Sequence, residues 1–182
     1  YVAYYAQQII RVDTIIDGFW FDTDANGKHH LTYYEGTDSI LTLPSDYQGG
    51  NYCIDGSVFS GNNKIISIQL PEAVDSIGAG AFNGCSSLTS INIPSGIPSI
   101  GNNTFVGCSS LTSMTLPESV SSIGASAFEG CSSLTSINIP AGVPSIGNNT
   151  FAGCSSLSSL TLPGSVTSIG ASAFEGCSSL TS

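Results

Sequence analysis

Six cysteines are the residues of this 182-residue chain with the widest chemistry, because thiols bind metals, form disulfides and act as nucleophiles. One is Cys53, and the others recur every 23 residues: Cys85, Cys108, Cys131, Cys154 and Cys177. No C-x-x-C pair or nearby histidine accompanies them, so a metal site is not expected. If each repeat formed one coil of a stack, their side chains would run parallel about 5 Å apart, which does not suit a disulfide. The sequence therefore predicts a buried ladder of free thiols, with Cys53 equally inert.

A second motif has the form of a calcium loop. Asp22, Asp24 and Asn26 precede Gly27 in the pattern D-x-D-x-N-G, which is the front half of such a loop. A complete EF-hand loop would carry glutamate at its twelfth position, where this chain has Tyr33. Asn-Gly between two strand-forming runs is instead a strong signal for a β-hairpin. We favour a plain hairpin turn, and calcium binding by Asp22, Asp24 and Asn26 stays open.

Catalytic patterns are not found in the sequence. It has no Gly-rich phosphate loop, no G-x-S-x-G and no H-E-x-x-H. The only histidines, His29 and His30, are adjacent on a predicted strand and would point to opposite faces as exposed hairpin residues. The glutamates of the repeats, Glu118, Glu129 and Glu175, would form at most a coincidental carboxylate pair. We therefore predict a protein that is not an enzyme and has no cofactor.

The charge of the chain excludes several partners. Its formal net charge is −10, and its only basic residues are Arg11, Lys28 and Lys64. So acidic a chain is not expected to bind nucleic acid or an anionic membrane surface. No apolar run approaches the roughly 18 residues of a membrane span. Because the chain starts at tyrosine rather than methionine, we expect the natural protein to be longer.

Two short sequences match the acceptor for N-glycosylation, which would matter only in a eukaryotic source. They begin at Asn102 and Asn148 and end at Thr104 and Thr150. The favoured interpretation is that these are polar turn residues preceding a core phenylalanine.

One repeated unit of 23 residues must position all these side chains. Its clearest copy, SMTLPESVSSIGASAFEGCSSLT, is residues 113–135, and five copies run from 67 to 181. An L-x-x-L-x-L core at such a period is the signature of a leucine-rich repeat. Residues 90–135 and 136–181 differ at only seven of 46 positions, so the true unit is a pair of coils that alternates Asn-Ile-Pro with Thr-Leu-Pro.

Each unit predicts two short extended pieces. Alternation in residues 90–93 places the isoleucines inside and Ser90 and Asn92 outside, and the following proline ends the strand. Residues 120–123 form a second extended piece, after which Gly124 would allow a sharp bend. Phe128 would then enter the core from a single turn. Since one coil cannot bury its own apolar side, neighbouring coils must stack.

The N-terminal part has a different composition. Residues 15–36 predict a β-hairpin, whereas residues 1–12 could be a strand, a helix or a linker. All seven tyrosines and the only tryptophan lie before residue 53, which suits a segment that covers the exposed end of a repeat array. We therefore divide the chain into an N-terminal segment and hairpin cap, 1–53, and a repeat array, 54–182, whose first repeat is degenerate.

The string IGxxAFxGCSSLTSIxIP resembles the Treponema-type, or BspA-like, leucine-rich repeats, clearly over residues 39–182. The predicted fold is a leucine-rich repeat solenoid, a β-rich right-handed superhelix with an N-terminal β-hairpin cap. Short parallel strands would line its concave face, and short strand or turn segments its convex face. The resemblance implies a secreted or cell-surface protein, since members of the family include adhesins that bind host matrix proteins or partner bacteria.

Any ligand would meet the outward positions of the strands. These are short, polar and uncharged, and they form two rows: Ser67, Ser90, Ser113, Ser136 and Ser159, and beside them Gln69, Asn92, Thr115, Asn138 and Thr161. We predict a non-catalytic adhesion module that binds a protein or glycan of a host or neighbouring cell on this face. The alternatives are a merely solvated face on a structural spacer or stalk. End-to-end self-association through the C-terminal coil is also open.

Overall fold

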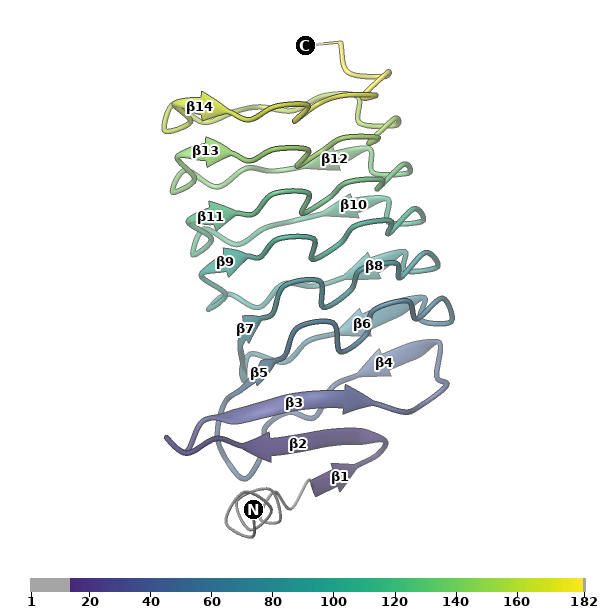
Figure 1. Cartoon of the computed structure of the whole chain (residues 1–182), viewed down its shortest axis with the longest axis vertical. Helices are drawn as coiled ribbons and strands as arrows, with labels where there is room; N and C mark the ends of the chain where they lie inside the picture. The colour runs from purple at the N-terminus through teal and green to yellow at the C-terminus, as the bar shows by residue number, and fades with distance from the viewer. Residues whose placement is uncertain (1–13, 182) are drawn as a thin grey trace, which may run out of the picture.

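Stacked coils that pair through short parallel strands make up most of this chain, as the computed structural model shows for residues 14–181 (Figure 1). One face of the stack carries β4 (Ile40–Thr42), β6 (Ser67–Gln69), β8 (Ser90–Ile91), β10 (Ser113–Met114) and β12 (Ser136–Ile137). The opposite face carries β5 (Tyr52–Ile54), β7 (Val74–Ile77), β9 (Ser99–Ile100), β11 (Ser122–Ile123), β13 (Ser145–Ile146) and β14 (Ser168–Ile169). The predicted leucine-rich repeat solenoid is confirmed. No helix occurs between residues 14 and 181, so none there could cross a membrane.

The register of the strands shows that each repeat makes one coil. Ser67 pairs with Ser90 and Ile68 with Ile91, which are equivalent residues of consecutive repeats. The same shift of one repeat relates β10 to β12 and β9 to β11. The isoleucines of these strands are buried, as their alternation with polar residues predicts. Equal register repeated along the stack brings identical side chains into contact.

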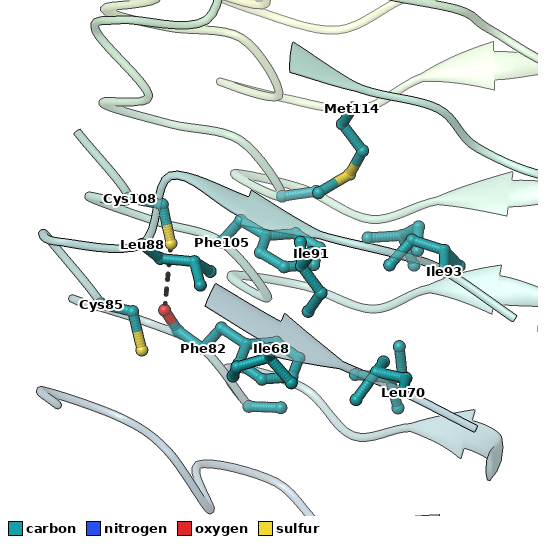
Figure 2. Packing of buried hydrophobic residues seen from close by; sticks show 14 of the residues in the cluster. Ile68, Leu70, Phe82, Cys85, Leu88, Ile91, Ile93, Phe105, Cys108 and Met114 are labelled. Carbon is teal, nitrogen blue, oxygen red and sulfur yellow. Dashed lines mark hydrogen bonds between the residues drawn. The ribbon is translucent and has the colours of Figure 1, made fainter. Parts of the chain in front are cut away.

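Phenylalanine forms the most regular of these contacts. The rings of consecutive coils are stacked nearly parallel, with centroids 5.3 to 5.6 Å apart, and the members are Phe59, Phe82, Phe105, Phe128, Phe151 and Phe174. Figure 2 shows two of the rings, Phe82 and Phe105, beside the inward isoleucines of two coils. Phe128 is fully buried, as predicted. The turn that carries it is bonded to the next coil, because the N–H of Phe128 donates to Thr150.

Glycine has two separate tasks in the coil that begins at Ser113, and one differs from the prediction. Gly124 was expected to permit a bend, yet the residues after it with positive φ are Ser126 (55°) and Gly130 (72°). Gly124 is required by proximity instead. A Cβ atom there would lie 2.5 Å from the backbone nitrogen of Asn102 in the preceding coil. The sequence marks the glycine but not which of the two tasks it performs.

The N-terminal cap is an antiparallel sheet continued by the solenoid. It consists of β1 (Thr14–Ile16), β2 (Phe19–Thr23) and β3 (His29–Tyr34), and β3 then pairs in parallel with β5. Inside, Tyr34 lies between Phe19 (4.8 Å) and Phe59 (5.8 Å), so the cap extends the aromatic stack. The predicted hairpin is confirmed. The open assignment of residues 1–12 lies outside the described residues.

Candidate ligand-binding face

The ten predicted binding residues all lie on the face of β6, β8, β10 and β12, which we call the ladder face. They form the two expected rows, and the coil that begins at Ser159 continues both. Ser67 and Asn92 are half-buried and the other eight are exposed. The structure thus brings the predicted residues together in one surface, while their role in binding stays a proposal.

Asparagine has a structural task on the ladder face that sequence reasoning missed. The side-chain oxygen of Asn92 accepts from the N–H of Leu70, and its amide donates to the Leu70 carbonyl, both at 2.7 Å. Asn138 holds Leu116 in the same way, at 2.7 and 2.8 Å. Each asparagine therefore extends the contact between two coils beyond the end of the short strand, because proline follows and no backbone ladder continues.

The threonine coils lack this bridge. Within residues 14–181 the hydroxyl groups of Thr115 and Thr161 have no bonded partner, and neither do the backbone N–H groups of Ile93 and Ile139 that they face. The alternation of Asn-Ile-Pro with Thr-Leu-Pro, visible in the sequence, was the available signal for this difference.

Three shallow hollows follow one another along the ladder face, of about 540, 420 and 460 Å³. Residues of the two polar rows line them, and the side chains of Ile68, Ile91, Met114 and Ile137 are buried beneath. None of the residues lining them is charged. Such a surface offers hydroxyl and amide groups for hydrogen bonds and, among its described residues, no titratable side chain, which suits recognition rather than acid–base chemistry.

Glutamate lines a further hollow elsewhere, of about 440 Å³. Glu129 and Glu175 occupy the same place in the repeat, two coils apart, with Ala152 between them. The sequence reasoning treated these carboxylates as unrelated and missed their common row. The other described residues that line this hollow are glycine, alanine and Asn149.

The predicted ladder of buried thiols is confirmed for four coils, and Cys177 in the last coil is half-buried. All six cysteines are free. The thiol of each of the five regularly spaced cysteines donates to the carbonyl of the phenylalanine one coil earlier, at 3.1 to 3.2 Å. Figure 2 shows this bond between Cys108 and Phe82. Burial raises the pKa of Cys85 to about 11 and that of Cys154 to about 12. These thiols serve packing, because a protonated buried thiol is a poor nucleophile.

We expect the free energy of unfolding to fall as the pH rises above 9, by about 2 kcal/mol near pH 11 for each strongly shifted thiol. The unfolded chain ionises near the ordinary pKa of 9.0, whereas the folded Cys85 ionises near 11, so alkali favours the unfolded state in that window. Urea unfolding between pH 7 and 11 measures this loss. Replacing Cys85 with alanine is the control, since buried tyrosines such as Tyr52 also have a raised pKa. An equal pH slope in the variant would contradict the assignment.

The two histidines are half-buried, in contrast to the prediction that they are solvent-exposed. His29 lies 2.8 Å from the Thr23 hydroxyl, and its ring packs edge-on against Tyr47. His30 Nδ1 lies 2.7 Å from an Asp55 carboxylate oxygen. The difference arises because β3 docks on β5 of the array, a long-range pairing that the local sequence does not reveal. Their contacts are separate, as the strand alternation predicts.

The calcium-like segment forms the expected hairpin turn. One oxygen of Asp24 accepts from the N–H groups of Asn26 (2.8 Å) and Lys28 (2.9 Å), and these bonds, chiefly that of Lys28, lower the pKa of Asp24. Asp22 is nearly buried within β2. Between residues 14 and 181 no three His, Cys, Asp or Glu side chains gather as metal ligands would.

The two acceptor sequences for glycosylation are turn residues, as favoured. The side-chain oxygen of Asn102 accepts from the N–H of Ala125 in the next coil at 2.9 Å. Thr104 is fully buried and donates to the Gly101 carbonyl. Asn148 and Thr150 repeat both contacts. The folded coil therefore uses these groups itself.

The repeat period, the equal strand register and the phenylalanine stack identify the architecture among known proteins. The BspA type Leucine rich repeat region matches residues 53–181 in six copies, which agrees with one degenerate and five regular repeats. This chain belongs to the BspA-type leucine-rich repeat family. Among curated proteins, none matches the sequence.

Solved structures of leucine-rich repeat proteins share the fold. The Treponema pallidum protein TpLRR is 29% identical with a TM-score of 0.75, over 93% of this chain and 91% of that one. A Bacteroides ovatus protein is 29% identical (TM-score 0.72; 92% and 52%). A Faecalibacterium prausnitzii protein, described as a leucine rich cell surface protein, is 27% identical (TM-score 0.70; 94% and 54%). This BspA-type chain spans about half the length of the latter two.

Proposed function

We propose that this chain is a non-catalytic module, secreted or displayed at a cell surface, that binds a protein or glycan through the ladder face. The observation that carries the proposal is the line of three uncharged hollows along that face, each lined by the outward strand residues. Elsewhere on the solenoid the hydroxyl groups of many serines and threonines bond to carbonyls of the neighbouring coil, whereas Thr115 and Thr161 have no such partner.

The location at a cell surface is supported by the family and by the F. prausnitzii relative described as a cell surface protein. The absence of catalytic patterns in the sequence supports a binding role. A structural spacer is the second candidate, and the regular stack of phenylalanine rings favours it, since identical coils add length without new chemistry.

Replacing Thr115 and Thr161 with lysine should weaken ligand binding about tenfold or more, because long charged side chains would block the hollows. The matched control replaces Ser122 and Ser145 with lysine on the opposite face, where no effect is expected. Binding would be measured against a panel of extracellular matrix proteins and glycans. Affinity that survives in the ladder-face variant would show that the site is elsewhere, and a chain that binds nothing in the panel would favour the spacer.

A further inference from the structure

We propose that the ligand of the ladder face is an extended, neutral, β-1,4-linked polysaccharide that lies along the solenoid axis and is recognised in steps of two coils. This inference rests on the proposed function and names the class of ligand for the same face. Three observations support it: fixed and free side chains alternate along the second polar row, the coils are evenly spaced, and none of the described residues that line the hollows is charged.

The first observation is that asparagine and threonine alternate along the second polar row, from Asn92 to Thr161. Asn92 and Asn138 are each held by two hydrogen bonds to the preceding coil, so the orientation of each side-chain amide is fixed before any ligand binds. Thr115 and Thr161, by contrast, have hydroxyl groups free to rotate. Groups fixed before binding lose little entropy on binding. The fixed side-chain amides therefore recur once in every two coils, whereas the backbone conformation repeats in every coil.

The spacing of the coils comes second. Neighbouring parallel strands lie about 4.8 Å apart, so two coils span about 10 Å. A β-1,4-linked polysaccharide turns each sugar over relative to the last and repeats after two sugars, at nearly that length. One sugar would lie over each coil, and the same edge of every second sugar would meet Asn92 and then Asn138. An extended polypeptide laid along the axis would repeat every two residues, at about 7 Å. That length matches neither the spacing of one coil nor that of two coils.

Charge and polarity select the class of polysaccharide. The residues lining the three hollows carry no charge, and the array has no basic residue after Lys64 to attract an acidic polymer. Ile91, Met114 and Ile137 are buried beneath the hollows, so a ligand there would meet mainly the uncharged polar rows. The free hydroxyl groups of Ser113 and Thr115 suit the polar rim of a sugar ring. A neutral sugar chain meets all of these features.

The test changes the register without changing the fold. In Thr115→Asn the new amide would reach Ile93 as Asn92 reaches Leu70, so every coil from 90 to 138 would carry a fixed amide. The probes are β-1,4-linked oligomers of glucose and of N-acetylglucosamine with two to six sugars, studied by calorimetry. For the unmodified chain we expect affinity to rise with each added disaccharide. For Thr115→Asn we expect the hexamer to bind about tenfold more weakly, because the sugar over that coil is turned over and presents its other edge to the fixed amide.

Two further variants control the test. Ser122→Asn makes a comparable change on the opposite face and should leave affinity within about twofold. Asn138→Thr removes one fixed amide and should weaken the hexamer as Thr115→Asn does, which keeps the test valid if either variant is unstable in thermal unfolding. Unchanged affinity in both ladder-face variants would overturn the two-coil register.

The outcome also separates this inference from the proposed function. If no neutral oligomer binds while a matrix protein binds and loses affinity in the lysine variant of Thr115 and Thr161, the polysaccharide is excluded and the binding face stands. If acidic glycans bind more tightly than neutral ones, the charge argument is wrong. If neither class of ligand binds, both proposals fail.

Discussion

Replacing Gly124 with alanine should destabilise the solenoid by about 3 kcal/mol, far more than the same change at an equivalent glycine one coil away. An alanine Cβ at Gly124 would lie 2.5 Å from the backbone nitrogen of Asn102 and 2.7 Å from the carbonyl carbon of Gly101. Backbone atoms cannot rotate away as a side chain does. The N–H of Gly124 also donates to Ile100 at 2.8 Å, so relieving the overlap would break the contact between the coils.

Gly101 supplies the matched control, because it occupies the same place in the repeat. Its nearest neighbour to an added Cβ is the Cα atom of Ala79 at 3.4 Å, so Gly101→Ala should cost less than about 1 kcal/mol. Urea unfolding of both variants, followed by circular dichroism, measures the difference. Equal losses at the two positions would show that the close approach in the Gly124 coil relaxes at little cost.

Replacing Phe128 with alanine should cost about 4 kcal/mol, because it removes a fully buried ring from the middle of the aromatic stack. The ring has a stacked neighbour on each side, Phe105 and Phe151, both with centroids 5.5 Å away. The cavity would separate two coils that otherwise meet through rings. In a repeat array such a defect weakens the interfaces on either side of it and leaves distant coils intact.

Phe174 provides the comparison for that variant. It has one stacked ring beside it, Phe151 at 5.6 Å, and it is only partly buried, so Phe174→Ala should cost about half as much. Amide hydrogen exchange would locate the loss, which we expect near residues 105–151 for Phe128→Ala. Protection lost uniformly over the chain would argue against separable coils.

The sequence alone predicts the fold well, because every coil repeats the same local pattern. Alternation around Ile91 and Ile93 predicts their burial, and the place of Phe128 in each repeat predicts a core ring. The spacing of the cysteines predicts a ladder of unbridged thiols. One copy of the pattern would be weak evidence for a fold. Five copies with the same residues at the same positions favour a stack of equivalent coils.

The features that depend on distances between coils could not be predicted. Whether Asn92 bonds to solvent or to the preceding coil depends on how closely the coils approach, which no local pattern states. The role of Gly124 and the contact of His30 with Asp55 have the same origin. The rows of the ladder face follow from strand alternation, but their ligand does not, because short uncharged side chains carry little information about a partner.

The alternating asparagines also bear on the mechanics of the rod. Asn92 and Asn138 tether the ladder face between the coils starting at 67 and 90 and at 113 and 136, whereas Asn102 and Asn148 tether the intervening pairs elsewhere, through Ala125 and Ala171. If every tether lay on one side, that side would be stiffer under load and the rod would bend toward it. Because these hydrogen bonds alternate between the ladder face and another part of the coil, both parts resist tension and compression when the solenoid bends. The solenoid should therefore resist bending more equally in different directions than a stack of coils tethered on one side only.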